Sequence, residues 1–166
     1  MMHEHSKEKL RVSLAELLPV LEEQLAAGKE VCFGPKGTSM LPMLRQGIDS
    51  VVLQKPPARL KKYDLPLYRR KDGSFVLHRV VGVNGNEYTT CGDNQSVREY
   101  HVRHSQVIGV VTGYYRGEEY ISCDSAKYKL YCRRRVRRQY WVGKLRMLKQ
   151  AVKRFLKKME KKGEQE

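Results

Sequence analysis

The apolar positions near the N-terminus follow the period of an amphipathic helix. Between residues 13 and 27 the leucines recur at steps of three and four, at Leu14, Leu17, Leu18, Leu21 and Leu25. Ser13, followed three residues later by Glu16, has the pattern of a capping box, and Gly28 is placed to end the helix. Pro19 lies past the first turn, where it removes a hydrogen bond and favours a kink. We therefore predict a helix over residues 13–27.

From Val31 onward the pattern changes to short runs rich in β-branched and aromatic residues. Turn residues separate these runs, and Asp72-Gly73 and Asn84-Gly85 have the composition of hairpin turns. This pattern predicts a compact, mostly antiparallel β domain. The expected strands cover residues 31–33, 50–54, 65–68, 75–83, 87–91 and 107–115.

The C-terminal segment combines an arginine cluster with a second helical period. The cluster falls within residues 127–138 and consists of Arg133, Arg134, Arg135, Arg137 and Arg138. Beyond it an apolar stripe advances in steps of four and three, with lysines among the intervening residues: Trp141, Leu145, Leu148, Val152, Phe155 and Met159. The pattern predicts a basic amphipathic helix. The chain thus divides into an N-terminal helical segment (1–30), a β domain (31–126) and a basic helical tail (127–166).

The formal net charge of +15 belongs almost wholly to the tail. Residues 1–126 contain 17 basic and 15 acidic residues, whereas residues 127–166 contain 16 basic and 3 acidic residues. Because the β domain is close to neutral, it has no sign of a nucleic-acid-binding face. An anionic partner, whether lipid, nucleic acid or an acidic protein, is expected at the tail, with the arginine cluster and Trp141 as its binding residues. Trp141 and Phe155 on one stripe, with lysines on the other, favour a membrane surface over DNA. Packing of the apolar stripe against the β domain is an equally simple alternative.

The cysteines and the N-terminus indicate a compartment. Cys32, Cys91, Cys123 and Cys132 form no C-x-x-C pair, and no histidine stands at zinc-ligand spacing, so we expect no metal and no cofactor. The first residues lack the apolar region of a secretory signal, and no window approaches the roughly 20 apolar residues that span a bilayer. We expect reduced thiols in a cytoplasmic protein that is soluble or peripheral at the inner membrane face.

Two polar residues stand in settings suited to nucleophilic chemistry. Ser39 follows Gly37 in a tight turn whose backbone amides could receive an oxyanion. His78 lies in the apolar run 75–83, where strand alternation would place it on one face with Val76 and Val80. Partial burial would keep its imidazole neutral and basic. Taken singly, Ser39 is more simply interpreted as a loop serine beside glycine, and His78 as a core or rim histidine.

A carboxylate that orients the histidine would complete such a site. Asp93 follows Gly92 after the predicted strand 87–91, where a turn could direct its side chain back toward its neighbours. Asp beside Gly is also an ordinary turn pair. Asp49, Asp64 and Asp124 remain competitors for the same role.

Considered together, these motifs resemble the signal peptidase family. Ser39-Met40-x-Pro42 precedes His78-Arg79-Val80-Val81-Gly82, with 39 residues from serine to histidine, and Gly92-Asp93-Asn94 follows, with Asp93 15 residues after the histidine. The order and spacing are similar to the ER and archaeal branch of signal peptidase I-like serine peptidases, which uses a Ser/His/Asp arrangement. The resemblance covers about residues 31–115.

The resemblance implies a mainly β, signal-peptidase/LexA-like domain, here with an N-terminal helix and a C-terminal basic amphipathic helix. It makes Ser39 the nucleophile, His78 the general base and Asp93 the third member. Thr38, Met40 and Pro42 would border the oxyanion hole and the substrate cleft. At the position two before the nucleophile, where many members carry a hydroxyl residue, this chain has Gly37.

The activity implied by this resemblance is endoproteolysis. The chain would cleave a leader or signal segment of a peptide or protein precursor through an acyl-enzyme, with small residues preferred before the scissile bond. The alternative hypothesis is a non-catalytic module that binds peptide or a membrane surface and whose basic tail docks on anionic lipid or nucleic acid.

Overall fold

Helix α1 (Leu14–Ala26) follows the predicted leucine repeat, continues through Pro19 and ends before Gly28, which has a φ of 75°. Only part of the repeat is covered, because Leu21 and Leu25 are buried while Leu17 is exposed. The computed structural model describes the backbone of residues 14–163 and the side chains of residues 16–154, so Ser13 of the predicted capping box lies outside the described residues.

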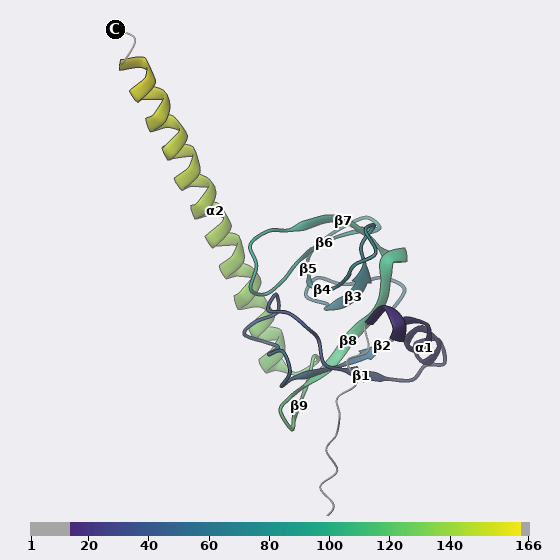
Figure 1. The fold of residues 1–166 in the computed structure, drawn as a ribbon. Helices are drawn as coiled ribbons and strands as arrows, with labels where there is room; N and C mark the ends of the chain where they lie inside the picture. Colours follow the sequence, from purple (N-terminus) through teal and green to yellow (C-terminus); the bar gives the residue numbers. More distant parts are fainter. Residues whose placement is uncertain (1–13, 164–166) are drawn as a thin grey trace, which may run out of the picture.

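Two antiparallel sheets follow α1 (Figure 1). Sheet A has the strand order β1-β2-β8-β3-β4, and β9 also pairs with β8; sheet B has the order β5-β6-β7. The strands are β1 (Val31–Phe33), β2 (Ser50–Gln54), β3 (Pro66–Arg69), β4 (Phe75–Leu77), β5 (Arg79–Asn84), β6 (Glu87–Cys91), β7 (Glu99–Arg103), β8 (Val107–Arg116) and β9 (Glu119–Ser122).

The predicted β body is present, but two of its strands were not predicted. Both β7 and β9 lie at sheet edges and keep most of their side chains at least partly exposed, so they lack the apolar alternation that marks a strand in sequence. Because the C-terminal helix is long, the fraction of residues in helices is close to the fraction in strands. With 31% helix and 32% strand, the fold is mixed α/β rather than mainly β.

The predicted strand 75–83 is wrong in one respect, because it is two strands separated at His78. β4 belongs to sheet A and β5 to sheet B, so the chain passes from one sheet to the other at this residue. Where a chain crosses between packed layers, both of its faces are covered and the alternation of buried and exposed positions disappears. All five residues from Val76 to Val80 are buried.

Two apolar clusters position the site. The first joins α1, sheet A and the start of the C-terminal helix, and it includes Met40, Met43 and Leu44 from the loop between β1 and β2. The second lies between the two sheets and includes Tyr68, Val76, Val80 and Tyr88. The loop is irregular, but the burial of these three side chains anchors it to the core. Each buried Met or Leu side chain contributes roughly 1.5–3 kcal/mol to the free energy of folding.

The predicted arginine cluster and amphipathic segment form one continuous helix, α2 (Ala126–Gly163). Ser125 caps it by accepting a hydrogen bond at its Oγ from the Tyr128 amide at 3.2 Å. The first turns pack on the body through Tyr128, Cys132 and Val136, which are buried, and the rest of α2 projects away (Figure 1). Within the described part of the chain, no helix has the length and apolarity needed to cross a membrane.

Candidate active site

Ser39 lies in the loop between β1 and β2, at the edge of a cleft of about 230 Å³. The loop is held by its own hydrogen bonds: Leu41 N donates to Thr38 O at 3.2 Å, and Leu44 N to Met40 O at 3.0 Å. Met40 is buried directly beside the serine. Ser39 is therefore a half-buried residue whose backbone is fixed on the core side.

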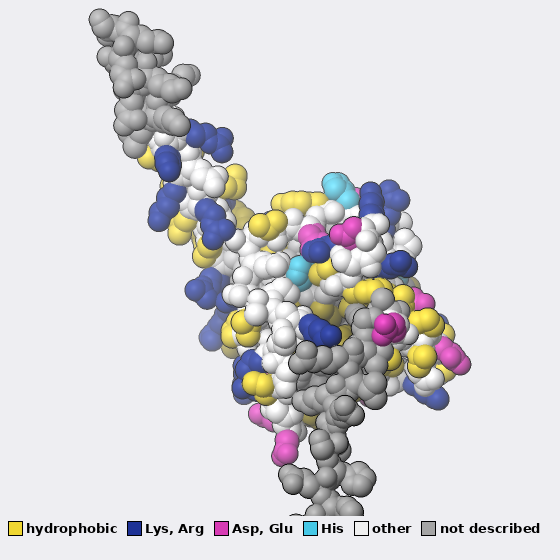
Figure 2. All heavy atoms as spheres, viewed as in Figure 1, with side chains coloured by type: hydrophobic (Ala, Val, Ile, Leu, Met, Phe, Trp, Pro, Cys, Tyr) yellow, Lys and Arg dark blue, Asp and Glu magenta, His cyan; other side chains and the backbone are white. Residues whose placement is uncertain are grey.

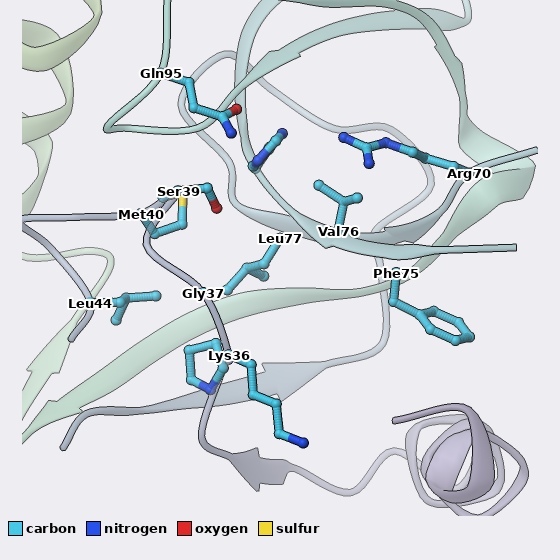
Figure 3. Close-up of a pocket in the computed structure, with 12 residues that line it drawn as sticks. Lys36, Gly37, Ser39, Met40, Leu44, Arg70, Phe75, Val76, Leu77 and Gln95 are labelled. Atoms are coloured by element: carbon cyan, nitrogen blue, oxygen red, sulfur yellow. The ribbon is translucent and has the colours of Figure 1, made fainter. Parts of the chain in front are cut away.

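Side chains from three parts of the chain border this cleft (Figure 3). The hydroxyl of Ser39, the amide of Gln95 and the guanidinium of Arg70 are all directed into the same space, above Val76 and Leu77 of β4. The remaining lining residues are Pro35, Lys36, Gly37, Met40, Leu44, Phe75 and His78. Val76 and Leu77 thus contribute apolar surface to the cleft, and the polar groups of Ser39, Arg70 and Gln95 converge on it.

Gly92 is the point at which the serine loop and the histidine meet. A Cβ atom at this position would lie 2.8 Å from Ser39 O and 3.0 Å from His78 Nε2. The Asn94 amide also donates to Ser39 O at 2.7 Å, which ties the serine loop to the turn after β6. Only a residue without a side chain permits this approach. The structure therefore brings together two predicted site residues that are 39 positions apart in the sequence.

The hydrogen bonds around Ser39 leave two groups available. Within the described residues, neither its amide nor its hydroxyl donates a hydrogen bond, and none joins the hydroxyl to His78. The Gly37 amide, by contrast, is occupied by Gln46 Oε1 at 2.6 Å. The free Ser39 amide is a donor beside the cleft of the kind that stabilises an oxyanion.

His78 is almost fully buried, with 3% of its surface exposed. Burial lowers the pKa of the imidazole below its ordinary value; the Glu99 carboxylate opposes this effect and the Arg70 guanidinium adds to it. The ring of Tyr68 packs edge-on against it, with 6.5 Å between ring centroids. His78 is therefore neutral near pH 7 and able to accept a proton, as the apolar run around it predicts.

The carboxylate nearest to the His78 ring belongs to Glu99, at the start of β7. Its Oε1 lies 3.0 Å from His78 Nδ1, which is within ion-pair distance. The contact is not aligned as a hydrogen bond, because Nδ1 has no hydrogen-bond partner among the described residues. Its effect on His78 is therefore electrostatic, favouring the protonated imidazolium over the neutral ring.

Glu99 is itself held in place by Arg70. Arg70 Nε donates to Glu99 Oε2 at 2.8 Å, and Arg70 Nη2 also donates to Oε1. Partial burial acts against ionisation of this carboxyl, but the two bonds from Arg70 outweigh it and the pKa of Glu99 lies below its ordinary value. Glu99 is thus a fixed negative charge on the Nδ1 side of His78, opposite the Nε2 atom that faces Gly92.

Asp93 does not contact His78, contrary to the sequence-based expectation. Both of its oxygens accept hydrogen bonds from Arg79, at 2.8 Å from Nε and 2.7 Å from Nη2, and Tyr131 donates to Oδ2 at 3.0 Å. The side chains of Asp93 and Arg79 are both fully buried. The adjacent residues His78 and Arg79 are both buried at the crossing between the sheets. The Asp93 carboxylate forms its charge-assisted, bidentate pair with the arginine and not with the histidine.

The other carboxylates named as competitors also lie away from His78. Asp49 accepts two side-chain hydrogen bonds and one backbone hydrogen bond from Arg45, which lowers its pKa. Asp64 accepts from the Lys61 amide at 2.7 Å, and Asp124 pairs with Lys129 at 3.1 Å. Each of the three stabilises a local turn or helix start.

Helix α2 secures the Asp93 turn from behind. Arg79 Nη1 donates to Tyr128 Oη and to Cys132 Sγ, at 2.9 Å in each case. Arg135 Nε donates to Asp93 O at 2.5 Å, and Gln139 Nε2 donates to Gly92 O at 2.7 Å. Burial opposes the charge of Arg79, but Tyr128 and Asp93 more than offset it, so its pKa is raised. The first four turns of α2 therefore support the residues that frame the cleft.

The three residues expected at the oxyanion hole and cleft have different environments. Met40 is buried and lines the cleft. Thr38 and Pro42 are exposed and do not line it. The Leu41-Pro42 peptide is cis, and Pro42 O accepts a hydrogen bond from Arg116 at 2.8 Å. Thr38 and Pro42 thus shape the loop that carries Ser39 instead of facing the reacting space.

The residues expected to bind anions divide between the body and solvent. Arg135 is half-buried against the Asp93 turn, whereas Arg133, Arg134, Arg137 and Arg138 are exposed. Trp141 is 56% exposed. The alternative in which the apolar stripe packs against the β domain does not hold for Trp141, Leu145, Leu148 and Val152; Phe155 and Met159 lie outside the side chains described.

The described residues hold no group of three or more His, Cys, Asp or Glu side chains arranged for a metal ion. All four cysteines are free thiols in the structure. Burial raises the pKa of Cys91, Cys123 and Cys132, which makes them poor nucleophiles. The chemistry that this arrangement can support is therefore centred on Ser39 and His78.

Sequence reasoning missed Glu99, Tyr131 and Gln139. Glu99 begins an edge strand that has little apolar alternation, so no predicted element pointed to it. A signal was nevertheless present, since Glu99 follows the Gly92-Asp93-Asn94 motif closely and precedes a run containing Tyr100 and Val102.

No protein-family model matches the chain, and no curated protein matches it significantly.

Proposed function

We propose that this protein is a serine endopeptidase that cleaves a leader or signal segment of a peptide precursor through an acyl-enzyme. The observation that carries the proposal is the meeting of Ser39 and His78 at Gly92, beside one cleft, with Nε2 of a neutral imidazole turned to the serine side. A hydroxyl is a weak nucleophile unless a base takes its proton, and His78 is placed to do so.

In this mechanism Ser39 Oγ attacks the scissile carbonyl carbon while His78 Nε2 takes the hydroxyl proton. The resulting oxyanion is stabilised by the free Ser39 amide, and Glu99 stabilises the imidazolium from the Nδ1 side. The imidazolium then gives its proton to the leaving amine, so the peptide bond breaks and an acyl-serine forms. A water molecule, deprotonated by the same histidine, releases the acyl group and restores the serine.

The substrate is proposed to bind as an extended segment along β4. This strand pairs with β3 on one side only, and its residues Phe75, Val76 and Leu77 line the cleft. An open strand edge offers main-chain hydrogen bonds to a peptide, while the adjacent pockets select its side chains. The small volume of the cleft, about 230 Å³, suits small residues next to the scissile bond, as the resemblance to the signal peptidase family implies. A signal-peptidase/LexA-like β domain is the finer fold proposed.

The test is cleavage of a panel of leader-like peptides by Ser39→Ala and His78→Asn variants. Each should lose turnover by at least a factor of about 10⁴ while keeping its thermal unfolding temperature. Ser105→Ala and His101→Asn are the matched controls, because both residues are exposed and neither lines the cleft. Turnover retained in both site variants would contradict the proposal.

A second candidate function is peptide binding without turnover. It is favoured by one observation, that no hydrogen bond links the Ser39 hydroxyl to His78 in the described structure. The two functions are separated by mass spectrometry after incubation with a fluorophosphonate or a substrate-like lipopeptide inhibitor. A covalent adduct on Ser39 that is lost in His78→Asn supports the peptidase, whereas saturable peptide binding with no adduct supports the binding module.

A further inference from the structure

The exposed face of α2 over residues 140–154 is a feature that the proposed activity leaves unused. The residues of its apolar stripe are at least half exposed, with Leu145 at 57%, Leu148 at 62% and Val152 at 50%. Leu145 and Leu148, together with Trp141, Lys144, Met147 and Ala151, border a shallow groove that is mostly apolar. Isolated exposed apolar residues are common, but a continuous stripe on a projecting helix marks an interaction surface.

This stripe points away from the body. At 100° per residue, Trp141, Leu145, Leu148 and Val152 fall within an arc of roughly 60°. The residues that reach the body, Arg135, Gln139 and Arg146, centre about 130° farther around the helix. The stripe therefore cannot fold back onto its own domain while these contacts hold.

The charges on the same segment determine which partner fits. Residues 140–154 contain five cations and no acidic residue, namely Lys144, Arg146, Lys149, Lys153 and Arg154. None of the five has an acidic partner among the described residues. Figure 2 shows Lys and Arg side chains in dark blue beside yellow apolar ones along this projecting segment. A second copy of the helix would repeat the same charge, and nucleic acid would leave the apolar stripe uncovered.

We propose that residues 140–154 of α2 form an interfacial helix that docks the protein on a bilayer rich in anionic lipid. The apolar stripe enters the boundary of headgroups and acyl chains, and the lysines beside it reach outward to the headgroup phosphates. Lys144 and Lys149 stand about 70° to either side of the stripe, which suits this arrangement. The body lies on the opposite, solvent side of the helix.

Docking of this kind also sets the position of the cleft. Arg146 donates to Ser96, which follows the cleft residue Gln95, and Gln139 donates to Gln95 O at 3.0 Å. The helix and the cleft rim are thus one connected unit, and a docked helix holds the cleft at a constant distance from the bilayer. Membrane binding itself does not depend on whether Ser39 is catalytic, so its test uses binding alone.

Trp141 provides the probe, because it is the only tryptophan in the chain. The full chain is titrated with phosphatidylcholine vesicles and with vesicles of phosphatidylcholine and phosphatidylglycerol, and its emission and co-sedimentation are recorded. Partition onto the anionic vesicles should be at least tenfold stronger, with a blue shift of Trp141 and a loss of affinity at high salt.

Two variants test the two faces of the helix separately. Leu145→Gln with Leu148→Gln keeps the charge and should reduce partition at least tenfold, while Val97→Gln with Tyr100→Gln changes exposed apolar residues of the body and should have no effect. Lys144→Gln with Lys149→Gln, the two lysines that flank the stripe, should reduce binding to anionic vesicles on the order of 20-fold, about fivefold per cation. Circular dichroism establishes that helix content is kept in each.

Three results would overturn the proposal. The first is that the parent chain, the leucine variant and the lysine variant all bind with the same affinity, and that this affinity is the same for neutral and anionic vesicles. The second is tight binding to duplex DNA that is insensitive to the leucine substitutions, with no vesicle-induced shift of Trp141. The third is a concentration-dependent dimer that is lost in the leucine variant, again without vesicle binding.

Discussion

Glu99 Oε1 and His78 Nδ1 lie 3.0 Å apart, although one residue opens β7 and the other stands where the chain crosses from β4 to β5. The pairing of β6 with β7 brings Glu99 opposite Thr90, next to the end of β6 that carries Gly92. The same strand end thus organises both sides of the imidazole, with Glu99 near Nδ1 and Gly92, which also contacts the Ser39 loop, near Nε2. We infer that Glu99, and not Asp93, is the carboxylate that acts on His78.

Glu99→Gln should reduce kcat by a factor on the order of 10² to 10⁴, because the imidazolium formed during catalysis loses its counter-charge. Substrate binding should change little, so KM should stay within about threefold of the parent value. Arg70→Gln is the matched control, since it removes the partner of Glu99 but leaves the carboxylate next to His78. An equal loss of kcat in both variants would mean that the ion pair has only a structural role.

The pH profile should show His78 as a base with a lowered pKa. The neutral form is the active one, so kcat/KM rises with pH and levels off above the pKa of His78. Because burial lowers this pKa, the acid limb should lie below the ordinary histidine value of about 6.5. Glu99 favours the protonated ring, so Glu99→Gln should move the limb to still lower pH. A limb above pH 7 would show that burial does not control this group.

Asp93→Asn should act on stability, because it leaves the buried Arg79 charge without a partner. We expect a loss of about 3–5 kcal/mol in the free energy of unfolding, measured by urea denaturation monitored by circular dichroism. Asp124→Asn, in an exposed pair with Lys129, should change it by no more than about 0.5 kcal/mol. Unchanged stability together with abolished cleavage in Asp93→Asn would instead return Asp93 to the role of orienting the histidine.

Truncation after Tyr140 should separate the two halves of α2. The shortened chain keeps Gln139 and its bonds to Gly92 O and Asp93 O, so its cleavage of a soluble peptide should stay within about twofold of the full chain. Adding Gln139→Ala to the same truncation should cost about 1–2 kcal/mol of stability, because those carbonyls lose a donor. A truncated chain that is inactive on all peptides would show that the distal half of α2 is needed for the fold of the site.

Local patterns in the sequence were sufficient for elements whose burial follows a simple period. The leucine repeat predicted α1, the β-branched runs predicted most strands, and the stripe beginning at Trp141 predicted an amphipathic helix. In α1 and the strands these signals are local because one face of the element meets the core and the other meets solvent. The stripe of α2 has a helical period too, although it is exposed. The sequence alone also indicated that Ser39 and His78 belong together.

The tertiary structure decided which carboxylate faces which partner. His78 and Arg79 are neighbours in a run of buried residues, and no period in the sequence tells which of them Asp93 reaches. The crossing from sheet A to sheet B buries both, and the pairing of β7 with β6 then supplies Glu99 to the histidine while Asp93 goes to the arginine. Such a choice depends on the register of strands and the desolvation of charges across the whole fold, which sequence separation does not record.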